Sequence, residues 1–153
     1  MARKYLLRKN NSTQTLFPLP PCLFMKYFVT LKIPNSSDVF LELDNHHSPN
    51  TVKSFVEKLP FTVTLNIWGE EIYSSESPIS VSEENAKSSV QLNDVAYWPS
   101  GKAICLFYGP TPIGKKGEIT PASPVNVIGK IISPDKSILK KVDGINATFE
   151  LRQ

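Results

Sequence analysis

The sequence contains little cysteine, and this shortage excludes two classes of protein. Only Cys22 and Cys105 occur in 153 residues, so a secreted domain stapled by several disulfides is excluded. A structural zinc site needs four Cys or His ligands at short spacings, which this chain does not provide. Cys105 lies in an apolar run and is interpreted as a small core residue. We interpret both cysteines as reduced thiols of a cytoplasmic protein.

Histidine is equally scarce, which limits the catalytic options. His46 and His47 are the only two, and adjacent residues of an extended chain point in opposite directions, so they chelate one metal poorly. No strained turn that would present a nucleophile accompanies them. The glycines at 109, 114 and 117 match neither phosphate-binding pattern. The sequence therefore predicts no metal and no cofactor.

The chain also lacks long apolar runs, and residues 25–153 carry no excess of positive charge. No run approaches the roughly 18 residues of a membrane helix. The net charge of +3 comes from Arg3, Lys4, Arg8 and Lys9, which leave 13 basic against 14 acidic side chains in residues 25–153. A near-neutral body lacks the basic footprint of a nucleic-acid binder. We therefore expect neither a nucleic acid nor a membrane as partner.

The first 24 residues differ from the rest of the chain. They are basic, then polar, and three prolines interrupt their only apolar stretch, so they do not match a signal peptide. We expect a disordered extension over 1–24, with Met25 as a candidate true start and one domain over 25–153. N-terminal sequencing of the native protein tests this expectation.

Hydrophobic alternation with period two dominates the remainder. It predicts strands over 26–33, 39–43, 61–67, 95–98, 103–108, 125–128 and 147–151, a short return strand beginning at Glu71 and a short strand over 78–81. Ser48 and Pro49 predict the N-terminus of a helix that Pro60 ends. A similar Ser-Pro signal at 133–134 predicts a second, short helix carrying Ile138, Leu139 and Val142.

These elements predict a mainly β protein, a closed or nearly closed eight-stranded antiparallel barrel with two helices. Two apolar strands flank the connection from Gly109 to Pro124, which contains four of the thirteen prolines. Proline fixes φ and removes a backbone donor. The connection is therefore expected to form a stiff rim on the barrel.

Several short sequence motifs resemble those of a known family. The helix entry Leu41-Glu-Leu-Asp44 to Phe55 resembles the first strand–helix junction of cyclophilins. The chain is more similar to small cyclophilin-like proteins of unknown function from archaea and bacteria. The motifs that carry this similarity are Trp68-Gly-x-Glu-Ile-Tyr73, Ala96-Tyr-Trp-Pro-x-Gly101, Phe107-x-Gly-Pro-Thr-Pro112 and Pro121-Ala-Ser-Pro-Val-Asn-Val127. The resemblance spans about residues 26–151 and implies an eight-stranded barrel with two helices, without a known activity.

The resemblance also bears on prolyl isomerisation. Cyclophilin catalysis rests on an arginine that polarises the prolyl amide, helped by a glutamine and an aromatic pocket, and such help needs a fixed multi-donor cation. The only arginines here are Arg3, Arg8 and Arg152. The expected arginine should follow the helix, where this chain has Phe61 to Ile67. We therefore expect no efficient isomerase activity.

Amphipathic aromatics beside a stiff loop make a wall for a ligand. We predict that a peptide or small molecule binds in an aromatic groove under the rim, where carboxylates meet a positive or hydrogen-donating group. The candidates are Trp68, Glu71, Tyr73, Trp98, Tyr108, Thr111 and Glu118. Core packing also explains these aromatics. A divergent isomerase, an acid–base enzyme using Glu71 and Glu118, and a self-associating homo-oligomer stay open as alternatives.

Overall fold

The computed structural model describes residues 5–10, 13–18 and 23–152, with side chains from residue 23 onward. Tyr5–Asn10 (β1) and Thr13–Pro18 (β2) pair as an antiparallel hairpin. The basic, proline-interrupted sequence of residues 1–24 had not predicted a regular element in this segment. The domain boundary at residue 25 stays a prediction, and Cys22 lies outside the described residues.

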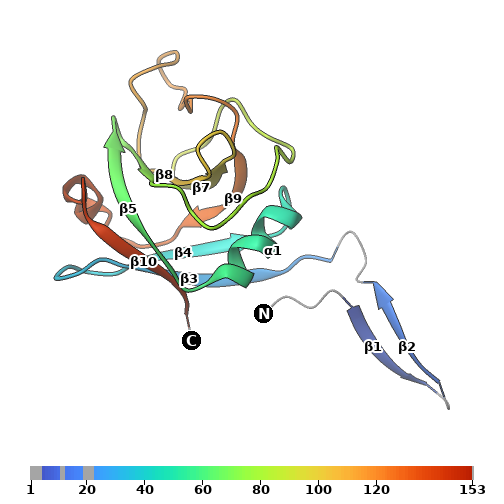
Figure 1. The fold of residues 1–153 in the computed structure, drawn as a ribbon. Helices are drawn as coiled ribbons and strands as arrows, with labels where there is room; N and C mark the ends of the chain where they lie inside the picture. Colours follow the sequence, from blue (N-terminus) through green and yellow to red (C-terminus); the bar gives the residue numbers. More distant parts are fainter. Residues whose placement is uncertain (1–4, 11–12, 19–22, 153) are drawn as a thin grey trace.

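Eight further strands form a closed antiparallel barrel, as expected (Figure 1). They are Lys26–Lys32 (β3), Val39–Asp44 (β4), Phe61–Trp68 (β5), Glu71–Ser74 (β6), Asp94–Trp98 (β7), Ala103–Phe107 (β8), Asn126–Ile131 (β9) and Asn146–Leu151 (β10). Around the barrel they run β10-β3-β4-β9-β7-β8-β6-β5, and β5 pairs with β10 to close it. Each of these eight strands is therefore hydrogen-bonded on both sides.

The alternation read from the sequence separates an inner and an outer face. On β8, for example, Ile104 and Leu106 join the main core inside the barrel, whereas Cys105 and Phe107 belong to a second buried cluster. The inner core also contains Val29, Leu31, Leu41, Leu43, Val63, Leu65, Ile72, Val95, Tyr97, Ile128, Ala147 and Phe149. Two buried faces on one strand mean that something outside the barrel covers β8.

The expected helix is Pro49–Lys58 (α1), and its apolar side packs into the core. The Phe55 ring lies 5.2 Å from that of Phe61 and 5.5 Å from that of Phe149, both in edge-on contacts that aromatic rings favour. The N-cap residue of α1 makes no side-chain capping hydrogen bond. Ser48 does occupy the N-cap position, but its hydroxyl donates to the carbonyl of Glu84.

The second predicted helix is wrong in type. The segment contains a single 3-10 helix, Ser137–Lys141, with Leu139 N–H donating to the Lys136 carbonyl three residues back at 3.1 Å. Leu139 is nonetheless buried in the main core, as the apolar pattern predicted. Only nine residues separate Pro134 from Gly144, which leaves little room for α-helical turns. Within the described residues, no helix is long and apolar enough to cross a membrane.

Two long connections cover the outer face of the barrel at β7, β8 and β9. Residues 75–93 link β6 to β7, and residues 108–125 link β8 to β9; Figure 1 shows both on the same side. Isolated β-bridges join them, from Lys87 to Val125 and from Val90 to Ile119. The second cluster lies beneath them and contains Val90, Ala96, Cys105, Phe107 and Val125.

Candidate functional site

A cavity of about 220 Å³ opens between the outer face of the barrel and the connection 108–125. We call it the aromatic pocket. It is lined by Trp68, Glu71, Tyr73, Trp98, Cys105, Pro121, Ala122 and Val125. The first five come from β5, β6, β7 and β8, and the last three come from the connection. Strands therefore hold one wall and the proline-containing loop holds the other.

Strand register explains why these side chains meet. Trp68 pairs with Glu71 across the β5–β6 hairpin, and Tyr73 pairs with Cys105 across β6 and β8. Glu71 and Tyr73 are two residues apart on one strand, so they point to the same face. Their face is the outer one, because Ile72 between them is buried inside the barrel.

The loop wall is attached to the β5–β6 turn. The backbone N–H of Glu70 donates to the Pro110 carbonyl at 2.9 Å, and that of Tyr108 donates to the Glu70 carbonyl at 3.1 Å. Gly69 has φ of +64°, and a Cβ there would lie 2.7 Å from Pro112 Cδ. Only glycine allows this approach. The stiff rim expected from the sequence is thus anchored at its start.

Trp98 is fixed from two sides. Its indole N–H donates to the Ser123 hydroxyl of the connection. A Cβ at Gly101 would lie 2.6 Å from ring carbon Cε3, so the turn backbone lies directly against the indole. The half-buried ring is held in place before any ligand arrives, which lowers the entropy cost of binding.

Glu71 is the anomaly of the pocket. Its side chain is only 5% exposed, and its Oε1 is buried without a hydrogen-bond partner. None of the ion pairs among the described side chains includes it. Burial raises the pKa of Glu71 from 4.5 to about 7, and the Cys105 thiol, a weak donor, partly offsets that rise. Near neutral pH the pocket therefore holds a carboxyl group poised between its two protonation states.

Cys105 is a buried free thiol beside that carboxyl. Burial raises its pKa well above the usual value, and the negative charge of Glu71 adds to the effect. A protonated thiol is a poor nucleophile. Cys105 therefore acts as an apolar wall and a weak donor in this pocket.

The structure brings four of the seven predicted site residues together, namely Trp68, Glu71, Tyr73 and Trp98. The other three do not line the pocket. Tyr108 packs against the main core instead. Thr111 is buried, and its hydroxyl donates to the Thr120 carbonyl inside the connection. Glu118 is exposed on the rim, so the predicted pair of Glu71 and Glu118 does not meet in this pocket.

Sequence reasoning missed Cys105, Pro121, Ala122 and Val125 as pocket residues. Cys105 had a usable signal, because alternation along β8 places it opposite Ile104 and Leu106. Its position across from Tyr73 depends on the pairing of β6 with β8, which are not neighbours in the sequence. The loop residues had no signal, because the packing of an irregular segment is set by tertiary contacts.

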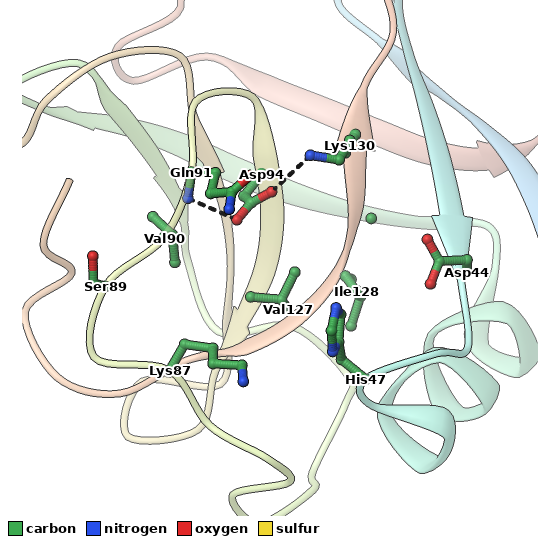
Figure 2. A pocket seen from close by; sticks show the side chains of 11 residues that line it. Asp44, His47, Lys87, Ser89, Val90, Gln91, Asp94, Val127, Ile128 and Lys130 are labelled. Carbon is green, nitrogen blue, oxygen red and sulfur yellow. Dashed lines mark hydrogen bonds and ion pairs between the residues drawn. The ribbon is translucent and has the colours of Figure 1, made fainter. Parts of the chain in front are cut away.

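A wider cleft of about 500 Å³ is lined by residues of the connection 75–93 and of β9, together with Asp44, His47 and Asp94 (Figure 2). Figure 2 shows Lys130 directed at Asp94, with the two charged atoms 3.5 Å apart. The backbone N–H of Gln91 also donates to Asp94, at 2.8 Å. His47 and Lys87 line the same cleft. Since its buried carboxylate already has partners, this cleft lacks the unmet charge found at Glu71.

Metal ligation is not supported by the arrangement of side chains. Among the described residues, no three His, Cys, Asp or Glu side chains gather as a cation site. The rings of His46 and His47 contact each other edge-on at 4.6 Å and are exposed. Both lie in the turn before α1, as expected.

Comparisons with known proteins agree with this fold. A family model described as Cyclophilin-like matches residues 28–150. The solution structure of hypothetical protein AF2241 from Archaeoglobus fulgidus is similar over 87% of this chain and all of its own length, with 38% sequence identity and a TM-score of 0.71. No curated protein matches the chain.

Proposed function

The chain belongs to the cyclophilin-like family, and from that premise we propose that it binds a peptide or small molecule in the aromatic pocket without efficient prolyl isomerase activity. The observation that carries the proposal is the buried Oε1 of Glu71, which has no hydrogen-bond partner and lies in a preformed cavity. Buried polar groups without partners are rare in proteins and need an explanation. A bound ligand that supplies the missing partner is such an explanation.

The walls of the pocket support the same proposal. Trp68, Tyr73 and Trp98 offer large, rigid, apolar surfaces at low conformational cost. A few polar groups amid apolar walls are typical of small-molecule sites. The volume of about 220 Å³ suits one side chain or a small metabolite rather than a folded segment. A longer peptide would have to place a single residue there.

The charge of the pocket argues against isomerase chemistry. Its lining contains no arginine or lysine to polarise a prolyl amide. Arg152 lies over the Phe40 ring on β4, 4.8 Å from its centroid, and Phe40 is not a pocket residue. The side chains of Arg3 and Arg8 lie outside the described residues.

We expect turnover of a proline-containing test peptide at no more than a few per cent of the rate of a true cyclophilin. The physical reason is the missing cation in the pocket lining. A coupled peptide isomerisation assay measures it, with a cyclophilin as the positive control. A rate near that of the control would contradict the proposal.

Ligand binding can be followed directly, because both tryptophans of the chain line the pocket. We expect Trp fluorescence to respond to at least one member of a panel of proline-containing peptides and small metabolites. Ala122→Phe should weaken that binding at least tenfold, because the added ring occupies the cavity. Ile113→Phe, at an exposed rim position that does not line the pocket, is the matched control and should bind like the wild type.

A second candidate function is an enzyme that uses Glu71 as a general acid or base. One observation favours it, because a pKa of about 7 suits proton transfer at neutral pH. It lacks the partner that the sequence suggested, since Glu118 does not line the pocket.

Self-association through a barrel edge has less support, because all eight barrel strands are paired on both sides. A buried free Cys105 fits the reducing, cytoplasmic location expected from the sequence.

A further inference from the structure

We propose that the group received by the aromatic pocket is an organic ammonium ion, with Glu71 as its counter-ion and Trp68, Tyr73 and Trp98 as the walls that contact its charge. This inference rests on the proposed function, since it names the chemical class of the ligand in that same pocket. The ligand is either a small amine or the amine-bearing side chain of a peptide. Both share the recognised group, a cationic nitrogen on an apolar stem.

The pocket contains a negative charge that has no positive partner. A carboxylate that is 95% buried is costly unless it is paired. Neither Lys, Arg nor His is among the residues that line the pocket, and the three ion pairs of the described side chains all lie elsewhere. A ligand cation would supply the missing partner and donate a hydrogen bond to Glu71 Oε1. An anionic ligand would instead meet an uncompensated like charge.

The walls of the pocket are rich in aromatic rings, which also favour a cation. The face of Trp or Tyr carries a negative quadrupole that attracts a cation within about 6 Å. Three such rings and one carboxylate surround the cavity. The remaining lining is Cys105, Pro121, Ala122 and Val125, which is largely apolar and suits a hydrocarbon stem. A ligand that was apolar throughout would use the rings but leave the carboxyl unsatisfied.

The volume of the aromatic pocket also limits the size of its ligand. The cavity of about 220 Å³ accommodates an ammonium group with several carbons, and the wall is stiffened by the Trp98–Ser123 hydrogen bond and the Gly101 contact. A stiff, small cavity discriminates against bulky ligands. The wider cleft at Asp94 does not compete for the same cation, because Lys130 already pairs with that carboxylate.

Binding of a permanent cation should then depend on pH. The titratable groups that face Glu71 are Tyr73 from β6 and Cys105 from β8, and the lining residues of the connection contribute none. Cys105 stays neutral between pH 6 and 8, since burial raises the pKa of its thiol further. Glu71, with a pKa of about 7, is the group that changes charge in this range. Cation affinity should rise about tenfold from pH 6 to pH 8.

The experiment compares two probes of similar shape, cyclohexylammonium and cyclohexanol, titrated into the full chain and followed by Trp fluorescence. An alkylammonium stays charged across this range, as lysine does. We expect the ammonium to bind at least tenfold more tightly than the alcohol at pH 8. Glu71→Gln should abolish that preference. Glu70→Gln is the matched control, because this neighbouring carboxylate does not line the pocket.

The outcomes separate this inference from the proposed function. Equal affinity for both probes, tighter ammonium binding at pH 6 than at pH 8, or an undiminished preference in Glu71→Gln would overturn the cationic ligand and leave the pocket as a binding site. No fluorescence response to either probe would also overturn it, and the wider ligand panel would then decide the proposed function alone. Unchanged near-UV circular dichroism of Glu71→Gln confirms that the variant is folded.

Discussion

Glu71→Gln should make the protein more stable at pH 8, by about 3 kcal/mol in the free energy of unfolding. The wild-type carboxyl must ionise in a buried pocket, and its pKa is about 7 in the folded chain against 4.5 unfolded. That difference corresponds to about 3 kcal/mol of destabilisation once both states have lost the proton. The amide of glutamine is nearly the same shape and carries no charge. Urea unfolding of both proteins measures the difference.

The sign of the pH dependence follows from the raised pKa. Between about pH 4.5 and pH 7 the folded state keeps the proton that the unfolded state has lost, so wild-type stability falls as pH rises through this window. The advantage of Glu71→Gln should therefore shrink to under about 1 kcal/mol at pH 5.

Glu70→Gln serves as the control for this experiment as well. Its side chain is half-buried and does not line the pocket, so its stability should follow the wild-type curve. A gain at pH 8 no larger than at pH 5 would show that the Glu71 carboxyl is solvated or paired in solution. A stabilised variant that also loses ammonium preference would link the cost in stability to function, as strained functional sites often do.

The fold was largely predictable because its signals are local. Alternation from Phe61 to Ile67 and the glycine turn at Gly69 define a strand and its hairpin without any tertiary information. Between Pro134 and Gly144, the sequence correctly predicted which apolar residues are buried. It wrongly predicted an α-helix where the structure has a 3-10 helix. Apolar periodicity reports which side is buried, whereas the choice between α and 3-10 turns depends on backbone strain and length.

The site was only half predictable because it depends on distant pairings. Trp68, Glu71 and Tyr73 belong to one hairpin, and their common face follows from spacing. Tyr108 was misplaced because it alternates with Phe107 and therefore points to the inner core. The loop residues that complete the pocket depend on how 108–125 folds back onto the barrel, which no local pattern encodes.

Helix capping shows the same limit. Ser48 has the sequence signature of an N-cap residue. Yet the acceptor for the backbone N–H groups at the start of α1 is Glu84, 36 residues away. Its carboxylate accepts the backbone N–H of Asn50 at 3.0 Å and that of Thr51 at 2.9 Å, besides the Thr51 hydroxyl. A carboxylate at a helix N-terminus also interacts favourably with the helix dipole. The connection 75–93 is thereby attached to α1.

Asn126 is the residue that holds Glu84 in place, and Asn126→Ala should cost about 3 kcal/mol. The side chain is fully buried. Its amide donates to the Ser82 carbonyl at 3.0 Å and the Thr51 hydroxyl at 3.1 Å, and its oxygen accepts the Glu84 N–H at 2.8 Å. Alanine removes all three hydrogen bonds, each worth about 1 kcal/mol net, although the Thr51 hydroxyl keeps its bond to the Glu84 carboxylate. Urea unfolding measures the loss.

Asn146→Ala is the matched control, since this asparagine is also on a strand and accepts a hydrogen bond, from Thr64, but is exposed. Its cost should stay within about 0.5 kcal/mol. Hydrogen exchange adds a local readout, because Asn126→Ala should speed exchange at the Thr51 and Glu84 amides while Asn146→Ala should not. Equal costs for the two variants would mean that the buried network does not hold the connection. Val125 directly precedes Asn126 and lines the aromatic pocket, so loss of this network should also loosen one wall of the proposed binding site.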